Sequence, residues 1–409
     1  MLTSSQYSTH SVRAIKLLYF LLYVGMAAWS TQFYAFLERE RSLSGVQIGA
    51  IAAVQQINNL IILPFWGMIS DRYGKRRVFL ILLAVSALCI EGFLYTGGFI
   101  YYLLFIVVFT TLYNPLAALV DSFALEKTSI PFVRSSYGNM RLWASLGWSV
   151  SSIGTGMLIR YAGFSFSVIF PITTVFFLVA WIVAYISLNK KHEYKTSKSP
   201  SFKTLRDLLM TDRRIVLFFL FCLTYYIFNS PILNMINIYY SEICVSYFSN
   251  LSAEELNVKI GLIVGIAFAV QSIFELPFMF FANFFIKRYG TRNVILFTMF
   301  VAFLRMMLYG LSTNPWFSVV IGATHGITLG LFWVAAVGYV HTLIPKSQNS
   351  TGQMLFNTFL AIGTCIGNLL TGFMKDTISI QNGMMVNATV ILGIILAGIF
   401  FTRRQARLA

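Results

Sequence analysis

Apolar stretches long enough to cross a lipid bilayer recur along this chain at intervals of about thirty residues. A transmembrane α-helix needs about twenty predominantly apolar residues in a row. Twelve such stretches are present, at 15–37, 46–70, 78–96, 101–125, 137–161, 164–188, 215–243, 260–285, 294–311, 316–343, 354–374 and 383–401. Only 11% of the 409 residues are charged and 57% are hydrophobic, whereas soluble domains carry about a quarter charged residues. The sequence therefore predicts an all-α membrane protein with twelve transmembrane helices.

The net charge of +16 is distributed unevenly between the two sides of these predicted helices. Lys and Arg gather on the side of the N-terminus, for example in 72–77 and 190–214, while the opposite loops hold only Arg39, Arg41, Arg160, Lys259 and Lys375. In membrane proteins the cytoplasmic loops carry the excess of basic residues. We therefore expect both termini to be cytoplasmic, in a cytoplasmic (inner or plasma) membrane. The basic charge then orients the chain in the lipid bilayer, and no nucleic acid is expected as a partner.

An internal repeat divides the chain into two halves. Val54-Gln55, Arg72-Tyr73-Gly74 and Thr155-Gly156 recur as Val270-Gln271, Arg288-Tyr289-Gly290 and Thr371-Gly372, all at an offset of 216 residues. The polar stretch between the sixth and seventh spans is typical of a linker. We predict an N-terminal six-helix half over 1–188, a cytoplasmic linker over 189–214 and a C-terminal six-helix half over 215–409. A substrate site at the interface of two such pseudo-symmetric halves is the expected arrangement.

Glycines are frequent in the fifth and eleventh spans. Small residues let membrane helices approach one another closely, and static packing and a sliding interface both explain them. The glycines are Gly138, Gly147, Gly154 and Gly156, and Gly352, Gly363, Gly367 and Gly372.

The loop after the second span reads Gly67-Met-Ile-Ser-Asp71-Arg72-Tyr-Gly74-Lys75-Arg-Arg77. It resembles the G-x-x-x-D-R-x-G-K/R-K/R signature of the major facilitator superfamily, whose members fold as two six-helix bundles. The resemblance implies gating roles for Gly67, Asp71, Arg72, Gly74 and Lys75. The glycines permit a tight turn and close helix approach, and Asp71 is expected to pair with a basic residue as a latch on the cytoplasmic face. The second-half copy has Asn283 and Lys287 at the positions of Gly67 and Asp71, which argues against a second latch.

Within this superfamily the chain is similar to the branch that includes lactose permease, nucleoside proton symporters and phenylpropionate permease-like proteins. The similar segments are Asp121-Ser-Phe-Ala-Leu-Glu126, Tyr137-Gly-Asn-Met-Arg-Leu-Trp143 with Trp148, Glu275-Leu-Pro277, and His325-Gly326 with Phe332-Trp333. The resemblance implies uptake coupled to a proton gradient, with no cofactor. The expected partners are a small-molecule substrate, protons and the lipid bilayer, and the expected state is a monomer.

Charged residues inside a membrane span are costly and mark functional sites. Glu275 lies twelve residues before Lys287 and Arg305 thirteen residues after Arg292, so at about 1.5 Å per residue both lie roughly 18 to 20 Å from the cytoplasmic loop. They are therefore able to pair, either as a structural ion pair or in coupling. His325 returns to nearly the same depth, and imidazole relays protons near neutral pH.

The resemblance to lactose permease assigns proton coupling to Glu275, Arg305 and His325. In that pattern an acid follows the histidine by three positions, where this chain has Thr328. The departure shifts the coupling proton to Glu275 or Asp121.

A second pair is predicted in the N-terminal half, where Asp121 and Arg141 share a depth closer to the cytoplasm. Arg141 and Trp148 are seven residues apart and lie on one helix face. An aromatic face beside an Arg recognises sugars or bases, and a similar Arg and Trp hold the sugar in lactose permease. Packing alone is the other interpretation of Trp148. Glu126 is interpreted as a solvated residue at the membrane boundary.

Amides within the spans favour a hydroxylated solute, although each alone is also able to join two helices. With Trp333, the candidates for substrate binding are Asn58, Asn59, Asn114, Asn237 and Gln271, alongside Asp121, Arg141 and Trp148.

The leading functional hypothesis is proton-coupled symport of a sugar, glycoside or nucleoside by alternating access. Uptake of an aromatic or organic acid, or proton-driven efflux, is the alternative within the same fold. A polytopic membrane enzyme is a remote alternative, because the sequence contains no HExxH or Walker motif. The four cysteines have no CxxC spacing, so no metal site is expected.

Overall fold

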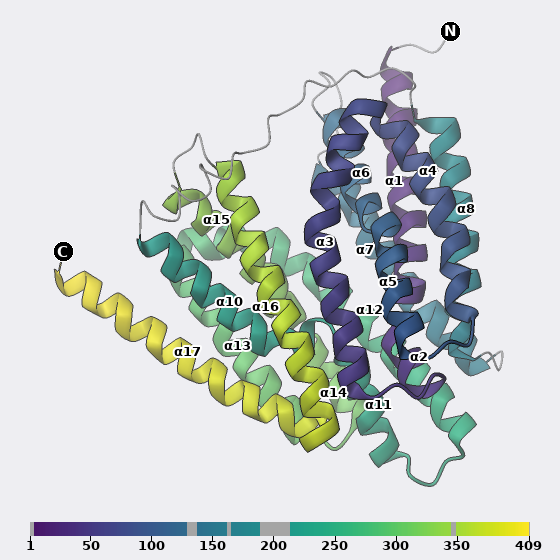
Figure 1. Cartoon of the computed structure of the whole chain (residues 1–409). Helices are drawn as coiled ribbons and strands as arrows, with labels where there is room; N and C mark the ends of the chain where they lie inside the picture. Colours follow the sequence, from purple (N-terminus) through teal and green to yellow (C-terminus); the bar gives the residue numbers. More distant parts are fainter. Residues whose placement is uncertain (1–3, 129–136, 162–164, 189–212, 345–348, 409) are drawn as a thin grey trace. The chain divides into compact units, whose positions relative to one another are not determined.

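The computed structural model describes residues 4–128, 137–161, 165–188, 213–344 and 349–408, and nearly all of them are helical (Figure 1). The predicted linker, 189–214, lies outside the described residues up to position 212. Helices form here because each long apolar segment must satisfy its own backbone hydrogen bonds in lipid.

The first six predicted spans all appear as helical segments. They are α1 (Ser4–Ser30) and α2 (Phe33–Arg39); α3 (Gly45–Tyr73); α4 (Lys75–Cys89) and η1 (Ile90–Leu94); α5 (Phe99–Tyr113) and α6 (Pro115–Thr128); α7 (Tyr137–Tyr161); and η2 (Phe166–Val168) and α8 (Ile169–Ser187).

The last six spans are also helical. They are α10 (Arg213–Leu233) and α11 (Ile236–Tyr247); α12 (Ala253–Tyr289); α13 (Thr291–Leu311); α14 (Pro315–Gly322), η3 (Gly326–Leu331) and α15 (Phe332–Leu343); α16 (Asn349–Ile378); and α17 (Ile380–Leu408).

Within the described residues, ten helical segments are long and apolar enough to cross a membrane. The other two predicted spans correspond to α7 and α17. α7 has 25 residues, but its glycines, serines and two arginines make it less apolar. In α17 the side chains are described only as far as Leu396, and the apolar segment Ile380–Leu396 continues in the sequence to Phe401.

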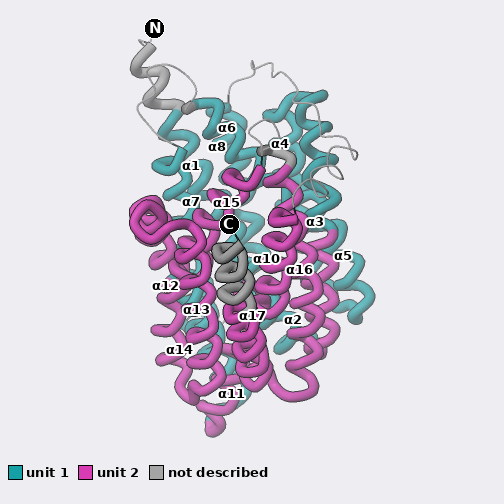
Figure 2. The backbone as a smooth tube through the Cα atoms, turned by 90° about the vertical axis from the view of Figure 1, so that its left-hand side faces the viewer, with its two compact units in different colours: residues 1–43, 58–196, 251–269 teal, residues 44–57, 197–250, 270–409 magenta. Residues whose placement is uncertain are grey.

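The chain divides into two compact units, drawn in teal and magenta in Figure 2. Unit 1 contains 1–43, 58–196 and 251–269, and unit 2 contains 44–57, 197–250 and 270–409. These units follow the two predicted halves except at two places. The first residues of α3 group with unit 2, and the first residues of α12 group with unit 1.

Each unit has its own set of packed helices. In unit 1, α1 packs along α7 and α8, and α4 also packs on α8. In unit 2, α10 packs along α16, and α13 packs along α17. Glycines allow these contacts, since a Cβ on Gly147 of α7 would lie 2.4 Å from the Phe20 carbonyl of α1, and one on Gly363 of α16 would lie 2.5 Å from the Leu223 carbonyl of α10.

The sequence repeat is also a repeat of backbone geometry. Gly74 and Gly290, 216 positions apart, have φ angles of 90° and 79° and precede α4 and α13. Residues that have a Cβ rarely adopt such positive φ angles, whereas glycine tolerates them. The same loop conformation therefore recurs in both units.

Two close helix crossings follow the same offset. In unit 2, a Cβ on Gly45 of α3 would lie 2.6 Å from the Gly372 carbonyl of α16. In unit 1, a Cβ on Gly156 of α7 would lie 2.7 Å from the Gly261 carbonyl of α12. Adding 216 to Gly45 gives Gly261, and adding it to Gly156 gives Gly372, so the crossings are counterparts.

Candidate functional site

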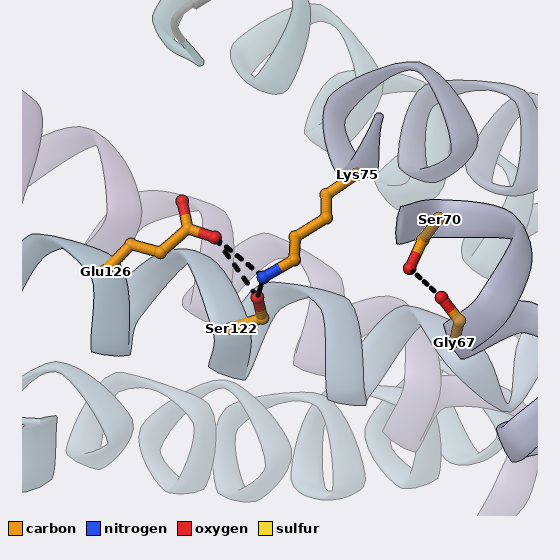
Figure 3. A network of polar contacts seen from close by, with 5 residues as sticks. All are labelled: Gly67, Ser70, Lys75, Ser122 and Glu126. Carbon is orange, nitrogen blue, oxygen red and sulfur yellow. Dashed lines mark hydrogen bonds and ion pairs between the residues drawn. The ribbon is translucent and has the colours of Figure 1, made fainter. Parts of the chain in front are cut away.

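The first residue of α4 is joined to α6 by an ion pair (Figure 3). Lys75 Nζ donates to Glu126 Oε1 at 2.9 Å and to Ser122 Oγ at 2.7 Å. Both charged side chains are mostly buried, at 20% and 15% exposure. The interpretation of Glu126 as a solvated boundary residue was therefore wrong. Sequence reasoning missed this contact because the partners are 51 residues apart.

The other predicted gating residues lie in the last turns of α3 and at the turn that follows it. Asp71 is exposed, and no hydrogen bond or ion pair joins it to another described residue. Arg72 is also exposed and lies 5.4 Å from the ring of Tyr73. Gly67 is within α3, where an added Cβ would meet nothing within 4 Å. The structure thus shows the tight turn at Gly74, but it shows neither close helix approach at Gly67 nor a pair for Asp71.

The predicted pair in the N-terminal half forms within unit 1. Arg141 Nη1 of α7 lies 3.7 Å from Asp121 Oδ1 of α6. The hydroxyl of Tyr19 on α1 donates to the same carboxylate oxygen at 2.6 Å. Arg141 in turn donates to the hydroxyl of Tyr23, and its guanidinium lies 4.7 Å from that ring. Three helices therefore hold one partly exposed ion pair.

Trp148 lies on the face of α7 that carries Arg141, as the spacing of seven residues predicts. Its ring centroid is 6.4 Å from that of Tyr23, at an interplanar angle of 56°. Arg141, Tyr23 and Trp148 together combine a cation with two aromatic rings, which is a combination that recognises sugars and bases.

Sequence analysis did not identify Tyr19 and Tyr23. They are four residues apart in a mostly apolar span, so they lie on one face of α1. Two phenols on one face of an apolar helix are a sequence signal of a polar site, and this signal was not used.

The candidate amides of unit 1 differ in their surroundings. Asn58 Nδ2 on α3 donates to Thr110 Oγ1 at 2.8 Å and to Thr111 Oγ1 at 3.1 Å. This amide nitrogen therefore joins α3 to α5, which is the role that was given as the alternative to substrate binding. Asn59 is partly exposed on α3. Asn114, between α5 and α6, has a buried Nδ2 with no partner among the described residues.

Arg305 of α13 is at the centre of a buried polar cluster in unit 2. The residue is 1% exposed. Its Nη1 lies 3.1 Å from His325 Nδ1 and 3.0 Å from Thr328 Oγ1, and its Nη2 lies 3.4 Å from the hydroxyl of Tyr309. The expected pair with Glu275 is not among the contacts of Arg305. The position where an acid was expected, Thr328, instead supplies a hydroxyl that accepts from the guanidinium.

A π-helical segment, η3, presents these partners to Arg305. It begins directly after His325 and contains Thr328. A Cβ on Gly326 would lie 2.1 Å from the Phe274 carbonyl, so glycine allows η3 to pack directly on α12. Single-turn π-segments within helices often occur at functional sites.

The remaining candidates of unit 2 lie around this cluster or apart from it. Glu275 packs against η3, since a Cβ added to Gly330 would lie 3.2 Å from the Glu275 Cγ. Gln271 is 3% exposed, and its Nε2 has no partner among the described residues. Asn237 is fully buried, and its Oδ1 accepts from the Ile238 amide. The ring centroid of Trp333 lies 6.3 Å from that of Phe356, which is a packing contact.

Comparisons with known proteins agree with this architecture. The sequence model of the MFS_1 like family matches residues 12–385. The chain is 28% identical over 373 residues to the uncharacterized transporter YwbF of Bacillus subtilis (strain 168), covering 90% of this chain and 87% of that protein. It is 27% identical over 355 residues to the maltose permease of Geobacillus stearothermophilus, covering 86% and 83% of the two chains.

Solved structures share the fold. A crystal structure of the nucleoside transporter NupG superposes with a TM-score of 0.81 at 18% identity, over 95% of this chain and 98% of that one. The arrangement of the described helices is thus that of a major facilitator transporter.

Proposed function

Because this chain belongs to the MFS_1 like family, and is therefore a multi-pass membrane transporter rather than an enzyme, we propose that it carries a sugar, glycoside or nucleoside together with a proton. Transport of small solutes is common to the relatives, since one is a maltose permease and the solved structure is a nucleoside transporter. The excess of Lys and Arg in alternate loops supports insertion in a cytoplasmic membrane with both termini inside.

The observation that carries the proposal is the Arg141 group in unit 1. Asp121 holds the guanidinium at 3.7 Å, and Tyr23 and Trp148 place two rings beside it. Arg donors bind hydroxyl oxygens, and aromatic rings stack on a sugar or base. We infer that this group binds the solute.

We assign the coupling proton to Glu275. It lies within a membrane-spanning helix and packs against η3, the segment that carries the partners of Arg305. A carboxyl group in low dielectric binds a proton readily, and a nearby cation opposes this. A change in the distance between Glu275 and Arg305 during alternating access would therefore load and unload the proton.

Vesicles reconstituted with the protein test this assignment. Glu275→Gln fixes the neutral form, so the variant should lose uphill accumulation driven by a pH gradient but keep exchange of solute across the membrane. Glu254→Gln, at an exposed position in the first turn of the same helix, is the control and should retain both activities. Full accumulation by Glu275→Gln would exclude Glu275 and leave Asp121 as the next candidate.

A further inference from the structure

Arg305 is a buried cation whose partners are all neutral. Its hydrogen bonds go to an imidazole, a hydroxyl and a phenol, those of His325, Thr328 and Tyr309. Among the described residues, no carboxylate lies within ion-pair distance of its guanidinium. By contrast, Arg141 in unit 1 has Asp121 at 3.7 Å. A charge buried in a membrane span normally faces a partner of opposite sign, and Arg305 has no ion-pair partner among the described residues.

One edge of the buried Arg305 guanidinium is incompletely hydrogen-bonded among the described residues. Nη1 is used by His325 and Thr328, whereas Nε is buried with no hydrogen-bond partner and Nη2 has only a long bond of 3.4 Å to Tyr309. Nε and Nη2 share one edge of the planar group. That edge is the fork through which Arg binds a carboxylate or phosphate with two parallel hydrogen bonds.

Another buried donor without a partner among the described residues is on α12. The Nε2 of Gln271 is buried and unpartnered, on a residue that is 3% exposed. A Cβ added to Gly322 would lie 3.6 Å from both the Gln271 Cγ and the Tyr309 hydroxyl. Gln271 of α12 and the phenol that Nη2 contacts therefore both lie against Gly322.

The tautomer of His325 adds a further donor. Arg has donors only, so Nδ1 of His325 must accept from Nη1, and the ring is neutral with its proton on Nε2. His325 is partly exposed, whereas Arg305 is not. His325 thus adds an N–H donor beside the Arg305 guanidinium, and such a donor favours binding of an anion.

We propose that Arg305, Gln271 and His325 form an anion-binding subsite, and that the transported solute is a hydroxylated molecule bearing a carboxylate or phosphate group. This inference rests on the proposed function and narrows its substrate class. The anionic group of the solute occupies the Nε and Nη2 edge of Arg305.

A pair of shape-matched variants tests the missing charge without any ligand. Thr328→Asp places a carboxylate beside Arg305, and Thr328→Asn places a neutral amide of the same shape there. The Asp variant should melt at a higher temperature than the Asn variant, because it supplies the counter-ion. A lower melting temperature for the Asp variant would mean that Arg305 already has its carboxylate, and it would overturn the proposal.

Matched ligands then test the substrate class on the purified protein. The probes are glucuronate against glucose, and uridine monophosphate against uridine, so that carboxylate and phosphate are distinguished. The anionic member of a pair should raise the melting temperature of the wild type and of Thr328→Asn, and this rise should disappear in Thr328→Asp. Stabilisation by the neutral members alone would overturn the anionic class while leaving the proposed sugar or nucleoside transport in place.

Discussion

At the scale of single residues, two arginines in membrane spans have opposite surroundings. Arg141 is partly exposed and has a carboxylate, two phenols and an indole nearby. Arg305 is buried, and its partners among the described residues are neutral. We propose that the first group binds a neutral hydroxylated surface and that the second binds an anion.

The planar fork of Arg141 leads to a prediction about binding. Arg141→Lys keeps the charge but loses the paired N–H groups. Hydrogen bonds to charged groups contribute about 1.5–3 kcal/mol, so solute affinity should fall by about tenfold or more while the protein remains folded. Equilibrium binding to the purified variant measures this.

Arg160→Lys is the matched control for Arg141→Lys. Arg160 is on the same helix, in its last turn, and its guanidinium lies 4.8 Å from the ring of Tyr161, outside the site. This substitution should leave affinity unchanged. Unchanged affinity in Arg141→Lys as well would remove Arg141 from the solute site.

At the scale of helices, α7 uses its glycines unequally. Gly147 contacts the α1 backbone and Gly156 contacts the α12 backbone, whereas a Cβ on Gly154 would meet nothing within 4 Å. The expectation that small residues allow close approach therefore holds at particular positions only. The same helix also carries Arg141 and Trp148, so its packing positions the proposed solute-binding face.

The glycines of α7 give a matched pair of substitutions. Gly156→Ala should destabilise the protein, because the new methyl group would lie 2.7 Å from the Gly261 carbonyl and overpacking costs about 1–3 kcal/mol. Gly154→Ala should be neutral or stabilising by up to about 1 kcal/mol, because alanine favours a helix. Thermal unfolding in detergent compares them. Equal melting temperatures of the two variants would show that the crossing of α7 with α12 accommodates the added methyl group without cost.

At the scale of the whole molecule, the repeat relates loops and crossings but not all of the chemistry. The loops at Gly74 and Gly290 share a positive φ, and the crossings at Gly156 and Gly372 are counterparts. Lys287 replaces Asp71, however, so the second loop has no acid to act as a latch. Gating by a charge on this face is therefore expected from the first repeat alone.

The latch prediction concerns transport more than binding. Asp71 has no hydrogen bond or ion pair with the described residues in this conformation, so Asp71→Asn should leave folding and solute affinity nearly unchanged. If Asp71 pairs only in another state of the cycle, the variant should transport several times more slowly. Arg77→Gln, exposed in the first turn of α4, should affect neither property. Parallel losses of binding and transport in Asp71→Asn would indicate misfolding and not a lost latch.

The amino-acid sequence alone determined the spans, the orientation signal, the repeat and the depth of each charged residue. These depend on local composition and on a constant rise per residue. Depth was sufficient to predict that Asp121 and Arg141 lie together, and they do, at 3.7 Å.

Only the tertiary structure decided which groups at one depth face one another. Glu275, Arg305 and His325 were expected at the same depth, yet Arg305 donates to His325 and Thr328, while Lys75 pairs with Glu126. The direction of a side chain around the helix axis depends on the packing of neighbouring helices. At His325 it also depends on the π-helical segment that follows, which changes the register of the turn. A sequence pattern that assumes a regular helix does not contain that information.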